Sequence, residues 1–146
     1  MSSPTQHRGH CRCGKVGIAS EFTPEFMVYC HCDDCRRATG SPVLASVAFP
    51  KNTVTWSGEG SVSRFVNGTA TRLFCSTCGS PIAQEHESRK DLTFFNTGFM
   101  ENPEAYPPQY HSYSGDQLSW LRLNDELPRH KATVLINQNV EDGSEK

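Results

Sequence analysis

The distribution of its seven cysteines most constrains how this 146-residue chain can fold. Three of them share one six-residue stretch and form what we call the three-cysteine cluster: Cys30, Cys32 and Cys35. The other four come as two Cys pairs and form the four-cysteine cluster: Cys11, Cys13, Cys75 and Cys78. Clustered thiols in a chain that we expect to lack an export signal are typical of metal ligands rather than of disulfides.

A closed zinc site takes four protein ligands, whereas a catalytic site takes three and leaves one position for water or substrate. A closed site of four cysteines and an open site of three would together use all seven. Spacing alone does not settle which four share an ion, but two distant pairs suit a structural role, whereas a single loop suits an ion open on one face. Soft thiolates favour zinc, although iron is chemically compatible. Some of the thiols, alternatively, are simply buried small hydrophobic side chains.

Composition and charge exclude two classes of protein. The net charge of -2 is unlike that of a nucleic-acid-binding protein, which usually presents a basic face. No apolar run approaches the roughly 20 residues that span a bilayer, and the polar N-terminus is unlike a signal peptide. We therefore predict a single domain at residues 9–137 with a frayed tail at 1–8 and a polar tail at 138–146, in the cytoplasm.

The pattern of apolar residues predicts a mainly β fold. Asn67-Gly68 between two apolar runs favours a two-residue hairpin turn, whose second strand presents Cys75 in a Cys-x-x-Cys-Gly zinc knuckle. A short helix is expected over residues 33–39, capped by Asp33 or Asp34 and ended by Gly40. Further strands are expected at 16–22, 43–49, 53–56, 82–85, 92–96, 110–113 and 134–136, and a short helix or strand at 118–123. A short apolar run at 26–29 leads into Cys30.

These blocks resemble the glutathione-dependent formaldehyde-activating enzyme family, which includes centromere protein V-like members. The resemblance rests on Cys11-Arg-Cys13-Gly14-Lys-Val16, Cys30-His-Cys32-Asp-Asp-Cys35-Arg36-Arg-Ala-Thr39-Gly40-Ser41, Phe74-Cys75-Ser-Thr-Cys78-Gly79, and Trp120 with Leu127-Pro128. It implies small antiparallel sheets around zinc sites, similar to the Rab-exchange-factor-like (β-tent) superfamily. It also implies a structural zinc on the four-cysteine cluster and a catalytic zinc on the three-cysteine cluster.

The resemblance further implies a carbon–sulfur lyase activity in which glutathione adds to formaldehyde to give S-hydroxymethylglutathione. Two zinc ions, a thiol and an aldehyde are then the expected cofactors and substrates. The metal ligands match residue by residue, whereas no glutathione-contacting residue does, so the substrate is glutathione or another thiol.

An open zinc site can bind the thiol as thiolate or polarise the aldehyde oxygen, and three anionic ligands favour the first. Arg36 and Arg37 would partly offset the charge of those ligands. His31 is the predicted proton carrier, and the alternative is that it is a solvent-facing spacer. Arg36 is the predicted partner of a substrate carboxylate, and the alternative is a surface ion pair. His111 is a more distant proton carrier, although we favour a packed strand residue there.

Two further functions compete with the enzyme. The first is a non-catalytic, zinc-stabilised protein-binding module, whose second site would be closed by His31, His86 or an aspartate. The second is a nucleic-acid-binding zinc ribbon, which would need basic and aromatic residues on one strand face. Arg64 and Arg72 flank the predicted hairpin without making such a face, so we rank the ribbon last.

Overall fold

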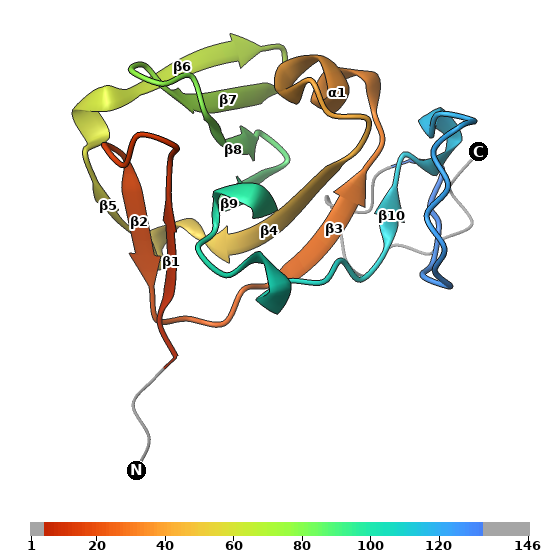
Figure 1. Cartoon of the computed structure of the whole chain (residues 1–146), viewed down its shortest axis with the longest axis horizontal. Coiled ribbons are helices and arrows are strands. Elements are labelled where there is room, and N and C mark those ends of the chain that lie inside the picture. The colour runs from red at the N-terminus through yellow and green to blue at the C-terminus, as the bar shows by residue number, and fades with distance from the viewer. Residues whose placement is uncertain (1–4, 133–146) are drawn as a thin grey trace.

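The structure, a computed structural model, describes residues 5–132 and divides them between two β-sheets, one α-helix and short 3-10 turns (Figure 1). The smaller sheet has the order β1-β2-β5, with β1 at His7–His10, β2 at Gly17–Ser20 and β5 at Thr55–Ser57. The larger sheet has the order β10-β3-β4-β9-β8-β7-β6. Its strands are β3 Phe26–Cys30, β4 Leu44–Pro50, β6 Val62–Asn67, β7 Ala70–Cys75, β8 Pro81–His86, β9 Arg89–Asn96 and β10 His111–Ser112.

Neighbouring strands are antiparallel throughout, except that β10 pairs with β3 in parallel. The predicted hairpin is confirmed, because β6 and β7 pair from Val62↔Cys75 to Asn67↔Ala70. The predicted mainly β class is also confirmed. Within the described residues, no helix has the length and apolar character needed to cross a membrane.

The largest hydrophobic core lies between the two sheets. Ile18 and Trp56 contribute from the smaller sheet, and Phe49 and Phe95 from the larger one. The two phenylalanine rings are fully buried and pack edge to face with centroids 6.1 Å apart. Burying each such ring contributes about 1.5–3 kcal/mol. This core therefore fixes how the sheets sit on each other.

Two members of the four-cysteine cluster belong to that same core. Cys11 and Cys75 have no exposed surface and pack among its apolar side chains. The core therefore brings together two segments that are far apart in the sequence.

The ordered chain begins earlier than the predicted tail allows. β1 starts at His7, so His7 and Arg8 belong to a strand rather than to a frayed segment. The reason is packing: the His7 ring lies 5.3 Å from that of Phe49, and its Nδ1 is 2.6 Å from the hydroxyl of Tyr106.

Two other expectations concern the C-terminal part. Residues 118–123 form neither helix nor strand, and Gln117 instead holds the carbonyl of Leu121 through its amide at 2.8 Å. The strand predicted at 134–136 lies outside the described residues.

Gly58 is expected to be indispensable for the packing of the loop that follows Cys13. Its φ is +72°, and a Cβ there would lie 1.7 Å from the carbonyl oxygen of Lys15. We expect Gly58→Ala to lower the free energy of unfolding by at least about 2–3 kcal/mol in urea denaturation. Gly60→Ala is the matched control, because a Cβ there meets no atom within 4 Å. Equal losses in the two variants would show that the contact with Lys15 is not the cause.

Candidate functional site

The three-cysteine cluster is built where strand β3 runs into the helix. Cys30 ends β3, and the helix α1 spans Asp33–Thr39. The Sγ of Cys32 accepts a hydrogen bond from the backbone N–H of Cys35 at 3.3 Å, which makes Cys32 the N-cap. The predicted caps, Asp33 and Asp34, are therefore wrong. The sulfur of Cys32 accepts the hydrogen bond that a backbone N–H of the first turn must donate. The carboxylates of Asp33 and Asp34 instead pair with arginines.

The three sulfurs lie close enough to share one ion. They all fall within 4.8 Å of one another, and the sulfurs of Cys35 and Cys30 are 3.4 Å apart. Hydrogen bonds from the thiols of Cys30 and Cys35 lower the pKa of Cys32 well below its usual value, and those contacts raise the pKa of Cys30. The cluster therefore shares negative charge, and its all-sulfur donor set fits zinc.

The four-cysteine cluster has the spacing of a tetrahedral site. A zinc ion with bonds of about 2.3 Å to four sulfurs places them roughly 3.8 Å apart. The sulfur of Cys13 lies 3.7 Å from that of Cys11 and 3.8 Å from that of Cys75, and all four sulfurs lie within 4.8 Å of one another. These distances fit a closed zinc site, which is what the family resemblance implies for this cluster.

Backbone amides support the same cluster. The N–H of Val16 points to the sulfur of Cys11 at 3.3 Å, and those of Thr77 and Cys78 point to the sulfur of Cys75 at 3.4 and 3.5 Å. Donors aimed at a sulfur stabilise its thiolate form. The two loops are thus shaped for thiolates.

A cavity of about 920 Å³ lies against the three-cysteine cluster. Its walls come from β3, β4, the start of α1, β7 with the turn before it, β8 with the turn after it, and Ser112 with Tyr113. Within residues 5–132, no histidine or carboxylate joins the three sulfurs to make a fourth ligand. The arrangement fits an ion that is held on one side and faces the cavity on the other.

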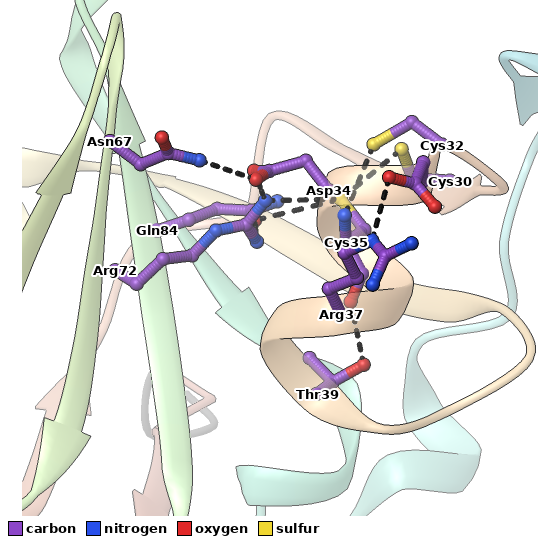
Figure 2. A network of polar contacts seen from close by, with 10 residues as sticks. Cys30, Cys32, Asp34, Cys35, Arg37, Thr39, Asn67, Arg72 and Gln84 are labelled. Carbon is purple, nitrogen blue, oxygen red and sulfur yellow. Dashed lines mark hydrogen bonds and ion pairs between the residues drawn. The ribbon is translucent and has the colours of Figure 1, made fainter.

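Arg72 is the site residue that sequence reasoning missed. Figure 2 shows its guanidinium reaching from β7 toward α1, where it donates hydrogen bonds to Asp34 and Gln84. Its Nη2 lies 3.5 Å from the sulfur of Cys35, and its side chain is only 12% exposed. A cation at this distance stabilises the thiolate of Cys35.

The two arginines predicted to offset the thiolate charge lie elsewhere. Arg36 donates hydrogen bonds to the carbonyl oxygens of His31 and Asp116 at 2.5 and 2.7 Å. Arg37 forms an exposed ion pair with Asp33 at 2.9 Å. Neither lines the cavity. Arg36 and Arg37 were predicted because they are close to the cysteines in the sequence. Arg72 is distant in the sequence, and the pairing of the strands brings it to the site.

His31 is fully buried, but it does not line the cavity. Its Nε2 lies 2.8 Å from Nδ1 of His111, whose Nε2 is 3.1 Å from the carboxylate of Asp125. Side chains alternate between the faces of a strand, so His111 and its neighbour Ser112 point to opposite sides. Because Ser112 lines the cavity, the histidine pair belongs to the other face.

Burial, helped by the nearby His111 ring, lowers the pKa of His31 to about 4, so this ring is neutral near pH 7. The two histidine rings stack with centroids 5.1 Å apart, and Tyr29 stacks on His111 at 4.8 Å. The preferred expectation for His111, a packed strand residue, agrees with these contacts. The catalytic roles of His31 and Arg36 stay predictions.

Comparison with known proteins agrees with the cysteine pattern. A family model described as glutathione-dependent formaldehyde-activating enzyme matches residues 6–116. An uncharacterized lyase of Schizosaccharomyces pombe is 25% identical over 100 residues, which cover 68% of this chain and 72% of the relative. The crystal structure of a Rhodobacter sphaeroides protein superposes with a TM-score of 0.55 at 22% identity, covering 84% of this chain and 98% of that one. This last likeness concerns the fold alone.

The two clusters are expected to respond differently to the loss of one sulfur. Cys75→Ser should remove cooperative unfolding, because a structural zinc contributes about 10–16 kcal/mol and Cys75 lies in the core. Cys32→Ser should remain folded and lose one of two zinc ions. Elemental analysis and near-ultraviolet circular dichroism would measure both effects. A folded Cys75→Ser beside an unfolded Cys32→Ser would reverse the two roles.

Arg72→Gln is expected to weaken zinc binding at the three-cysteine cluster by about 10–100-fold, as loss of a group that supports a ligand usually does. Arg72→Lys should restore only part of it, because an ammonium cannot fork between Asp34 and Gln84. Titration with a competing chelator would measure the affinity. Arg64→Gln is the control, since Arg64 pairs with Glu85 on the exposed side of the same hairpin. Unchanged affinity in Arg72→Gln would contradict a role for the contact with Cys35.

Proposed function

This chain belongs to the glutathione-dependent formaldehyde-activating enzyme family, and on that premise we propose that it is a zinc-dependent carbon–sulfur lyase-type enzyme. Its reaction would form or break thiol–aldehyde adducts, with S-hydroxymethylglutathione as the family's example. The relative named as a lyase supports the class of reaction. The reducing cytoplasm, where thiolates stay free to bind metal, is the compartment that this function predicts.

One observation carries the proposal: the three-cysteine cluster faces a cavity of about 920 Å³ and gains no fourth ligand from residues 5–132. Zinc bound there would supply an open coordination position at which a thiol is held as its thiolate. A cavity of this size has room for a thiol that is much larger than the small aldehyde to which it would add.

The chain's own residues would hold the site in a fixed geometry. Arg72 joins α1 to β7 and β8 through Asp34 and Gln84, so it fixes Cys35 against the rest of the wall. Tyr113 packs beside the cysteines and covers them from the side of β10. Beside these side chains, Cys30 and Cys35 are buried and Cys32 is partly exposed.

His31 and Arg36 are proposed to act on the loop rather than on the substrate. Arg36 holds the carbonyl of His31, and the His31 ring is anchored to His111. Since His31 stands between two of the cysteines, these contacts position Cys30 and Cys32. The transfer of a proton to or from the substrate would then fall to a group that lines the cavity.

A non-catalytic protein-binding module is the second candidate. It is favoured by one observation: Phe65 and Val66, next to the hairpin turn, are 60% and 69% exposed. Exposed apolar side chains of this size mark docking surfaces in some proteins. Such a module would leave its zinc inert to added thiol.

The enzyme proposal predicts that Cys32→Ser loses more than about 100-fold in the turnover of a thiol–formaldehyde adduct, because it removes a ligand rather than a supporting group. The four-cysteine cluster should keep its zinc in this variant. Arg37→Gln is the control, because Arg37 lies on the same helix with its side chain 80% exposed. Full metal content together with full turnover in Cys32→Ser would refute the assignment.

A further inference from the structure

Two buried serine hydroxyls on the cavity wall have no hydrogen-bond partner among the described residues. Ser46 is 1% exposed and Ser112 is 0% exposed, and both line the cavity. A buried hydroxyl without a partner destabilises a fold, and natural proteins rarely leave one in place. Two in one wall point to a ligand that supplies the missing partners.

The strand register places both hydroxyls beside Cys30. Ser112 pairs with Cys30 across β10 and β3, and Ser46 pairs with Val28 across β4 and β3. Paired residues share a face, so Ser112 is roughly 5 Å from Cys30 and Ser46 is its diagonal neighbour at roughly 7–8 Å, measured between backbones. Because β3 separates them and their partners on β3 are two residues apart, the serines are roughly 12 Å apart between backbones. A ligand that meets both is therefore extended.

The charges of the cavity argue against an anionic ligand. Its lining includes the carboxylates of Asp34 and Glu87, and Arg72 is the only lysine or arginine that residues 5–132 contribute to it. The two terminal nitrogens of Arg72 are already engaged by Asp34, Gln84 and Cys35, and its Nε is buried. Burial lowers the pKa of His86, so this ring adds no charge near pH 7. Among the described residues of the lining, a carboxylate would find no side-chain cation free to pair with it, and a zinc ion held by three thiolates would leave the site with a net negative charge.

We infer that the cavity takes the adduct of an extended thiol that is uncharged or cationic, and that hydrogen bonds from Ser46 and Ser112 hold it. Ser112, next to Cys30, binds the oxygen that derives from the aldehyde. Ser46 binds an amide or hydroxyl group of the thiol. This inference rests on the proposed function and narrows its substrate class away from free glutathione, which carries two carboxylates.

Glutathione and its diethyl ester form the matched pair of probes, because they share one peptide and differ in the two carboxylates. With formaldehyde as the aldehyde, we expect the ester to show at least about a tenfold lower KM. Glu87→Lys should narrow that difference by lowering the KM for glutathione. An equal or lower KM for glutathione in the wild-type protein would overturn the inference while leaving the proposed function intact.

Variants of the two serines test the hydrogen bonds that the inference assigns to the cavity wall. Ser46→Ala and Ser112→Ala should raise the KM for the ester about three- to tenfold, as loss of one hydrogen bond does. Their melting temperatures without ligand should equal or exceed that of the wild type, since an unpartnered hydroxyl is removed. Ser20→Ala is the opposite control: its buried hydroxyl is partnered by Thr53 and Phe22, so it should lower the melting temperature and leave KM unchanged.

A binding measurement that needs no turnover separates a failure of the proposed function from a failure of the inference about the substrate class. If the wild-type protein turns over neither adduct, the proposed function fails. The melting temperature with the ester alone then decides the inference. A rise that both cavity variants weaken and Ser20→Ala retains supports it, and no rise, or an equal rise in all variants, overturns it.

Discussion

Mutual repulsion between sulfur atoms is the constraint on which this structure depends. The fold holds thiols 3.4–3.8 Å apart in two places, a separation at which ionised sulfurs repel strongly unless a cation lies among them. Backbone amides offset part of that repulsion at the four-cysteine cluster, and the guanidinium of Arg72 does so at the three-cysteine cluster. Different groups thus offset the same repulsion at the two sites, and the three-cysteine cluster faces the larger cavity, of about 920 Å³.

The larger sheet divides the chemistry around Cys30 between its two faces. On one face lie the sulfurs, the cavity and the serine hydroxyls, and on the other lie His31 and His111 with their link to Asp125. The alternation of strand side chains is enough to separate them, although His31 is the immediate neighbour of two cysteines in the sequence. Proximity along the chain was therefore a poor guide to proximity in the site.

The sequence predicted the features that depend on local spacing. The turn at Asn67-Gly68, the helix after Cys32 and its end at Gly40 all follow from neighbouring residues, and the structure agrees with each. It could not predict Arg72, because its contact with Cys35 depends on the register of β7 against β8 and on where α1 lies. The N-cap was also missed, because the sulfur of Cys32 replaced the carboxylate oxygens that usually fill this role.

Cys13 and Cys75 lie 62 positions apart in the chain yet 3.8 Å apart in space, and this separation affects folding as well as stability. Closing so long a loop costs conformational entropy before any contact of the sheet is gained. An ion bridging these two segments acts as a reversible crosslink, which shrinks the unfolded ensemble much as a disulfide does but needs no oxidant. The lifetime of the folded domain would then follow the supply of free zinc around it.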